Sequence, residues 1–128
     1  MPRQSNTTPP TPGLLHLRVS AGADFYMGPG RADLLELIAE TGSIAAAGKR
    51  MGMSYKRAWS LVQALNGGFG RPLVEASRGG SAQGGATLTA EGAEVLQRYR
   101  HMQEETRKAI AADVAALAAL ITDLSHRK

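Results

Sequence analysis

Residues 42–88 read GSIAAAGKRMGMSYKRAWSLVQALNGGFGRPLVEASRGGSAQGGATL, and this stretch decides the fold. It holds two short helical patterns separated by a glycine turn, then an apolar strand, a glycine-rich loop and a second strand. It also carries the positive charge of the chain. The stretch has a net charge of +5, against +4 for the whole chain, because it contains one anion, Glu75, and six cations: Lys49, Arg50, Lys56, Arg57, Arg71 and Arg78. A basic patch on a helix-turn-helix followed by a hairpin predicts a protein that binds duplex DNA.

The two helical patterns are each preceded by a serine. Ser43 is expected to cap a helix over 44–51, since its hydroxyl can accept a hydrogen bond from an unpaired amide of the first turn. That helix is built from small residues, which let another helix cross closely, and Gly52 ends it. Ser54 is expected to cap the next helix, from residue 55 to about 66, which the glycines at 67 and 68 should end. Its core-facing residues are Ala58, Leu61, Val62 and Leu65.

The open side of the second helix is the candidate recognition surface. Arg57 is the best candidate for a bidentate contact to guanine, because its planar fork matches that base edge, whereas Lys56 suits a phosphate. Trp59 lies next to the core stripe and is expected to pack. The alternative to DNA binding by this helix is that its open side is an ordinary solvated helix face. With the wing described next, the predicted DNA-binding residues are Ser43, Lys49, Arg50, Ser54, Tyr55, Lys56, Arg57, Ser60, Gln63, Arg78, Gly79, Gly80 and Gln83.

Residues 72–88 predict a wing beside the helix-turn-helix. A strand over 72–77 is followed by the glycine-rich loop 78–85 and a partner strand over 86–88. In a wing, Arg78 would enter the minor groove or clamp a phosphate; the alternative is a merely mobile surface loop. A nucleotide-phosphate cradle is disfavoured, because the lysine at 49 is followed by arginine rather than by Ser or Thr, and no strand precedes it.

The flanking segments complete the predicted architecture. Alternating apolar and polar residues predict a strand over 15–20, and a helical stripe follows over 31–40. Thr89 can cap a helix that runs to about 124, with apolar residues at steps of three and four. Unbroken, it would be ~50 Å long, which suggests a partner subunit; the alternative is a second helix after a bend near Thr106. Its apolar stripe consists of Val95, Tyr99, Met102, Ile110, Val114, Leu117, Ile121 and Leu124.

The predicted fold class is mainly α with a small β-hairpin wing: a winged helix-turn-helix with a long C-terminal dimerisation helix. We expect a disordered arm over 1–13, the DNA-binding domain over 14–88, and a helical dimerisation segment over 89–128.

Three motifs of this stretch resemble the N-terminal DNA-binding domain of the ModE family of molybdate-responsive bacterial transcription regulators. They are GSI at 42–44, SYKRAW at 54–59, and the double-glycine wing that ends in ATLT at 86–89. Their order and spacing match over residues 14–102, and LysR-type regulators share a looser form of the pattern. The resemblance implies a winged helix that dimerises through its first and last helices. Full-length relatives bind molybdate in β-barrel modules that follow this domain; the chain has no β-rich region after it, so a molybdate response is implied by resemblance alone.

Composition narrows the other classes. The 128 residues fit one domain, and the absence of cysteine excludes disulfides and thiolate metal sites. No apolar run reaches the roughly 18 residues of a membrane span, and the first residues lack the apolar core of a signal peptide, so a cytoplasmic location is expected. His16, His101 and His126 are far apart with no ligand-spaced partners. We therefore expect no enzyme activity, no metal and no cofactor within the chain.

The sequence thus favours a homodimeric regulator, a repressor, that occupies a palindromic DNA operator. A second interpretation is a protein-interaction module that uses its long C-terminal helix to join a separate sensor subunit. A third is a direct oxyanion sensor, with molybdate at the helix N-terminus beside Ser43 or at the wing glycines.

Overall fold

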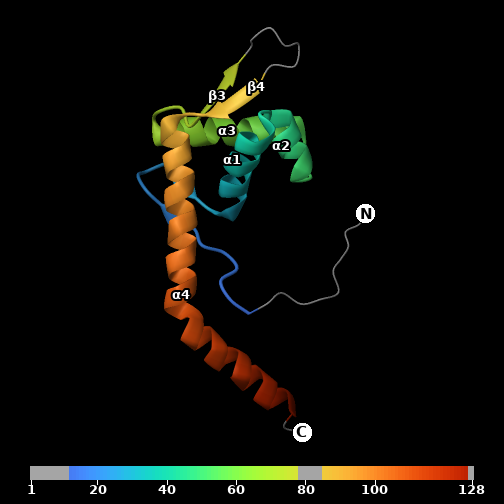
Figure 1. Cartoon of the computed structure of the whole chain (residues 1–128), viewed down its shortest axis with the longest axis vertical. Helices are drawn as coiled ribbons and strands as arrows, with labels where there is room; N and C mark the ends of the chain where they lie inside the picture. The colour runs from blue at the N-terminus through green and yellow to red at the C-terminus, as the bar shows by residue number, and fades with distance from the viewer. Residues whose placement is uncertain (1–11, 78–84, 127–128) are drawn as a thin grey trace. The chain divides into compact units, whose positions relative to one another are not determined.

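The computed structural model describes residues 12–77 and 85–126, which are mainly helical with two small antiparallel sheets. The second helix, a turn, the third helix and the β3–β4 hairpin form a winged helix-turn-helix (Figure 1), which confirms the predicted fold class. Residues 16–102 form one compact unit, and the described residues outside that range belong to a second. The elements are β1 (Val19–Ser20), β2 (Tyr26–Met27), α1 (Pro29–Thr41), α2 (Ile44–Arg50), α3 (Tyr55–Phe69), β3 (Val74–Ser77), β4 (Gly85–Leu88) and α4 (Ala90–His126).

Helix α1 supplies the centre of the core of unit 16–102. Its side chains Leu34, Leu35 and Ile38 are fully buried. The helix begins at Pro29, where a missing amide hydrogen costs nothing, and ends at Gly42 in the left-handed conformation. Burial of this face removes several large aliphatic side chains from water, each worth about 1.5–3 kcal/mol.

The two serine caps predicted from the sequence are both present. Ser43 Oγ accepts from the amide of Ala46 at 3.0 Å, and Ser54 Oγ accepts from the amide of Arg57 at 3.1 Å. The small residues of α2 serve the predicted close crossing, because a Cβ at Gly48 would stand 2.8 Å from the Cβ of Ala58 on α3. A glycine here lets the two helices of the motif meet.

Helix α3 is longer than predicted and continues through the glycines at 67 and 68 to Phe69. The expectation that these glycines end the helix is therefore wrong. A Cβ at Gly68 would lie 2.6 Å from the carbonyl oxygen of Asp24, so this glycine allows a close backbone approach within the helix. The helix ends at Gly70, in the left-handed conformation. Phe69 at its last turn meets Phe25 edge to face.

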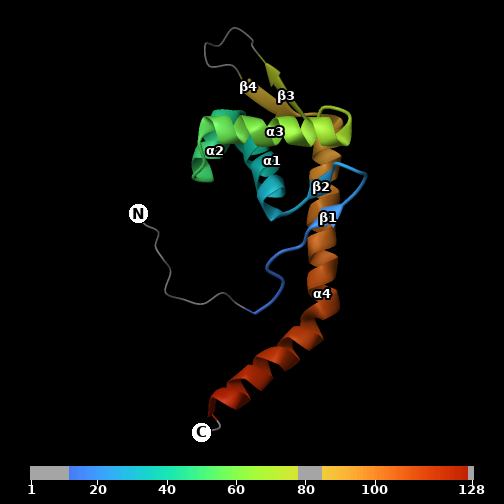
Figure 2. The ribbon, with the colours of Figure 1, turned by 180° about the vertical axis from the view of Figure 1, so that it is seen from behind.

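The wing strands are tied to the helices at their base. β3 and β4 pair antiparallel, with Val74 opposite Leu88, and both views place them beside α3 (Figures 1 and 2). Asn66 of α3 holds β3, because its amide oxygen accepts from the amides of Leu73 and Val74 while its NH₂ group donates to the Val74 carbonyl. The side chain of Asn66 thus ties the start of the wing to α3.

The N-terminal strand is shorter than the predicted strand over 15–20. Only Val19 and Ser20 pair with β2, and Leu15 is 74% exposed. The carbonyl of Leu17 instead accepts a hydrogen bond from Tyr99 Oη at 2.6 Å. Part of the alternating segment therefore serves helix α4 rather than a sheet.

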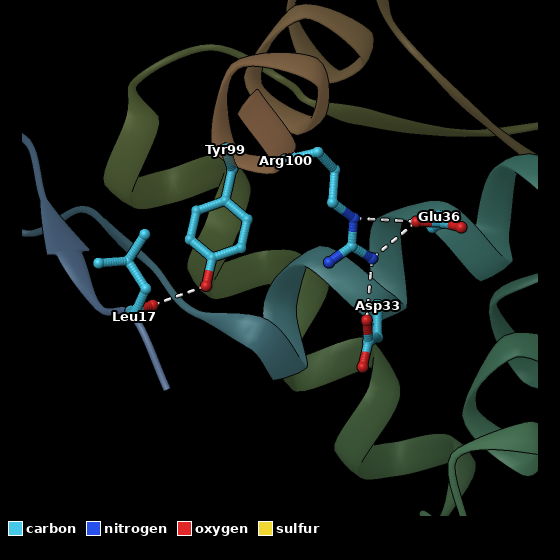
Figure 3. Close-up of polar contacts among 5 residues, drawn as sticks. All are labelled: Leu17, Asp33, Glu36, Tyr99 and Arg100. Carbon is cyan, nitrogen blue, oxygen red and sulfur yellow. Dashed lines mark hydrogen bonds and ion pairs between the residues drawn. The ribbon is translucent and has the colours of Figure 1, made fainter. Parts of the chain in front are cut away.

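Helix α4 is continuous from Ala90 to His126, so the alternative of two separate helices is not observed. Within unit 16–102, its anchor is the pair Tyr99 and Arg100 (Figure 3). Tyr99 is fully buried, and Arg100 bonds Asp33 and Glu36 of α1 at 2.6–3.0 Å. Burial lowers the pKa of Arg100, but its hydrogen bonds to the two carboxylates raise it more, and the net pKa is raised.

Candidate nucleic-acid interface

Helix α3 has one face in the core and one face in solvent. Ala58, Val62 and Leu65 are buried, as the sequence predicts. The other face offers hydroxyl, amide and cationic groups, which are the groups that contact bases and phosphates. All its predicted contact residues are exposed: Ser54, Tyr55, Lys56, Arg57, Ser60 and Gln63.

The cations at the start of α3 and at the end of α2 are available to an outside partner. Within residues 12–77 and 85–126, Lys49, Lys56 and Arg57 make no ion pair. Arg50 approaches Glu40 of α1 at 3.5 Å, but both side chains are more than half exposed, so the pair is screened by water. Lys49 and Arg50 stand at the C-terminus of α2, where they also complement the helix dipole.

Tyr55 and Trp59 form an aromatic pair on α3, one turn apart. Their rings meet edge to face with centroids 6.4 Å apart, and Trp59 Nε1 donates to Tyr55 Oη. Trp59 is half-buried and packs against the core, as expected from its position beside the apolar stripe. Tyr55 is 55% exposed and remains able to contact a ligand.

Ser43 and the wing residues are the predicted DNA contacts that the structure does not place on the exposed face of a helix. Ser43 is half-buried, and its hydroxyl is engaged with its own helix. The predicted wing residues Arg78, Gly79, Gly80 and Gln83 lie outside the described residues. The strands that flank them are described, and β3 carries the exposed anion Glu75.

Two cations near α3 were missed by sequence reasoning. Arg18 beside β1 and Arg31 in α1 both lie against the ring of Tyr26, and together with Arg57 they line one pocket. No sequence signal identifies this group, because its members come from separate elements and only the tertiary fold brings them together.

The described residues hold no cluster of three or more His, Asp or Glu side chains that could bind a metal ion. None of the described helices is both long and apolar enough to cross a membrane.

The geometry defines a class of protein, a winged helix-turn-helix in which α3, the second helix of the motif, is exposed and cationic. Residues 31–93 carry a helix-turn-helix domain that matches the family described as "Bacterial regulatory helix-turn-helix protein, lysR family". It is a family of DNA-binding transcription regulators, which agrees with the expectation that the chain is not an enzyme.

Particular relatives sharpen this placement and match the resemblance seen in the sequence. The chain is 48% identical over 73 residues to the molybdenum-pterin-binding protein MopB of Rhodobacter capsulatus, covering 57% of this chain and 27% of MopB. It is 38% identical over 84 residues to the DNA-binding transcriptional dual regulator ModE of Escherichia coli K12, covering 66% of this chain and 32% of ModE. The chain thus spans about a third or less of the length of these relatives.

A solved structure shares the fold. The crystal structure of the CbnR_DBD–DNA complex superposes with a TM-score of 0.52 at 30% identity, covering 70% of this chain and 95% of that one. A LysR family transcriptional regulator, VV2_1132, superposes with a TM-score of 0.51 at 21% identity, over 71% of this chain and 29% of that one. It supports the fold alone.

Proposed function

We propose that this chain binds a palindromic DNA operator as a homodimer and represses transcription of molybdate-related genes. The observation that carries the proposal is the solvent face of α3, where Lys56 and Arg57 are exposed with no ion pair among the described residues. Placed in a major groove, the first turns of α3 would present these cations to bases and phosphates. Such a protein works on chromosomal DNA in the cytoplasm.

The gene class comes from the relatives. MopB is named as a molybdenum-pterin-binding protein, and the regulator ModE is named for both DNA binding and transcriptional regulation. The similarity to these proteins covers the helix-turn-helix, which is the part that would read DNA. A related recognition helix supports a related class of operator.

The homodimer is supported by the later part of α4. Leu117 and Ile121 are 60% and 65% exposed and lie one helical turn apart, with the half-buried Val114 on the same stripe. A row of exposed aliphatic side chains is unfavourable in water and marks a contact surface. Two copies joined by a two-fold axis would place their recognition helices about 34–36 Å apart, in successive major grooves.

The test is fluorescence anisotropy with DNA from upstream of molybdate-transport genes, against scrambled DNA, at near-physiological salt and with and without molybdate. Tight, sequence-selective binding is expected. Binding that is weak and equal for both DNAs would contradict operator recognition and favour an interaction module that joins a separate sensor subunit. A reporter gene behind the same DNA then gives the sign of regulation.

Two substitutions separate base reading from phosphate binding. Arg57→Ala should relax base preference at one position of each half-site, at a cost of about 1–3 kcal/mol. Lys56→Ala should weaken binding to all sequences alike and reduce the salt slope by about 1. Arg98→Ala removes an exposed arginine from α4, outside the predicted interface, and serves as the charge-matched control. A uniform loss in both variants would show that Arg57 does not read a base.

A further inference from the structure

A small pocket lies between the start of α1, the β1–β2 hairpin and the first turns of α3. Its volume is about 200 Å³. Three arginines from these three places line it, together with His16, while Met53 and Leu61 supply apolar wall. The residues that line it include no carboxylate: Arg18, Arg31 and Arg57 are its charged groups.

Two of the arginines are stacked on one aromatic ring. The guanidinium carbons of Arg18 and Arg31 lie 3.9 and 3.7 Å from the centre of the Tyr26 ring. Arg31 Nη1 also donates to the Tyr26 carbonyl oxygen at 3.2 Å, which fixes its position. One ring therefore carries both guanidinium groups, each held by a cation–π contact, and both are positive charges that attract an anion.

The charge of this group is uncompensated in the part of the chain that the structure describes. Arg18, Arg31 and Arg57 make no ion pair there. The Nε of Arg31 is buried and has no hydrogen-bond partner. A buried polar atom without a partner is rare in folded proteins and often marks the place of a bound water or ion. A guanidinium group with a free donor is suited to an oxyanion, whose oxygens can accept two parallel hydrogen bonds.

We infer that this pocket binds a tetrahedral oxyanion group of the phosphate type, held by Arg18, Arg31 and Arg57. The group has two possible sources: a free oxyanion in solution, or a phosphate of a DNA backbone that reaches the pocket beside α3. Because Arg57 belongs both to this pocket and to the predicted recognition surface, a free oxyanion here would compete with DNA for that side chain. The DNA source rests on the proposed function, whereas the free oxyanion does not.

The first arm uses the whole chain without DNA and inorganic phosphate as the probe. Phosphate is titrated at constant ionic strength, with chloride as the exchanged anion, while the backbone amide resonances of Gly28, Gly30 and Arg31 are followed by NMR. Saturable shifts are expected. Arg31→Gln and Arg18→Gln should each weaken binding about 10-fold, since each removes a charged hydrogen-bond donor. Arg98→Gln removes the same charge from α4 and should leave the shifts unchanged.

The Arg18 variant guards against a folding defect, because Arg18 is exposed and its side chain makes no hydrogen bond among the described residues. Far-UV circular dichroism should match that of the unaltered chain. Shifts that rise linearly without saturation, or that are equal in all variants, would exclude a free oxyanion.

The second arm measures DNA affinity of the same variants against salt concentration. If a DNA phosphate occupies the pocket, Arg18→Gln should reduce the slope of log affinity against log salt by about 0.9, whereas Arg98→Gln should not. Saturation in the first arm assigns a free oxyanion, and a slope change without it assigns the DNA backbone. If the protein binds DNA but shows neither saturation nor a slope change, the pocket proposal is overturned and the proposed function stands. Absence of DNA binding by the unaltered chain overturns the proposed function, and the first arm then decides the pocket alone.

Discussion

The two parts of helix α4 continue one apolar stripe but end in different surroundings. In unit 16–102, Tyr99 is completely buried and Val95 packs against the core. Beyond Met102, Leu117, Leu120 and Ile121 are each more than half exposed. Periodicity of apolar residues says that a helix has a face to cover, but it does not say what covers it. One part finds its partner within its own domain, and the other stays exposed, which is the observation that supports the proposed homodimer.

The largest effect is expected from breaking the buried part. Tyr99→Ala removes a fully buried aromatic ring, which should cost unit 16–102 about 3–5 kcal/mol of its free energy of unfolding. Urea unfolding followed by circular dichroism would measure the loss. The matched change in the exposed part is Leu117→Ala, where less than about 0.5 kcal/mol is expected at protein concentrations too low for dimers. Equal losses in both variants would mean that the two parts do not differ as described.

Charged substitutions on the exposed apolar stripe test whether it is the dimer contact. Leu117→Asp together with Ile121→Asp places two carboxylates on the stripe, and burying them in a dimer would be costly. We expect dimer dissociation to become at least about 100-fold easier, or about 2.7 kcal/mol. Analytical ultracentrifugation over a range of concentrations would measure it.

The control for this pair is Ala119→Asp. Ala119 is exposed and lies on α4 between the two altered positions, but about half a turn around the helix from Leu117. It should dimerise like the unaltered chain. A monomer at all concentrations before any substitution would refute the homodimer, and the exposed stripe would then need a different partner.

A smaller effect is expected from the polar anchor of α4. Arg100→Gln removes the ion pairs with Asp33 and Glu36 while keeping the aliphatic stem and a polar end. Arg100 is about one-third exposed, so solvent screens the pairs, and a loss of about 1 kcal/mol is expected. The loss should shrink in 1 M salt. Arg107→Gln alters an i,i+3 pair on the exposed part of the same helix and should have almost no effect.

Much of this molecule could be predicted because its signals are local. The serine caps at 43 and 54, the buried stripe of α3 and the wing strands each follow from residues close together in the sequence. The small residues of α2 predicted a close crossing, and Gly48 provides it against Ala58. Placement of the predicted DNA contacts on the open face of α3 follows from the same helical period.

What could not be predicted depends on residues distant in sequence. The glycines at 67 and 68 read as a helix end, but Gly68 is explained by the approach of the Asp24 carbonyl. The segment 15–20 read as one strand, because nothing local shows that Leu17 accepts from Tyr99, more than 80 residues later. The cluster around Tyr26 is equally non-local. Loop residues between elements and backbone close approaches carry no periodic signal.

The smallest effect is expected from the ionisation of Tyr99 in the buried part of α4, and it depends on pH. Burial raises the pKa of the Tyr99 hydroxyl above its ordinary value of 10.0, opposed by the nearby charge of Arg100 and assisted by Asp33. The neutral phenol is therefore favoured in the fold, and its contribution is complete below pH 10 and lost as the pH rises through the raised pKa. Tyr99→Phe keeps the ring but loses the bond to the Leu17 carbonyl, so it should be about 1 kcal/mol less stable at pH 7. This difference should narrow above pH 10. There the phenol of the unaltered chain ionises in the unfolded state before it does in the fold, which lowers the stability of that protein alone. Urea unfolding of both proteins from pH 7 to 11 measures it, and a constant difference across that range would contradict the role of burial.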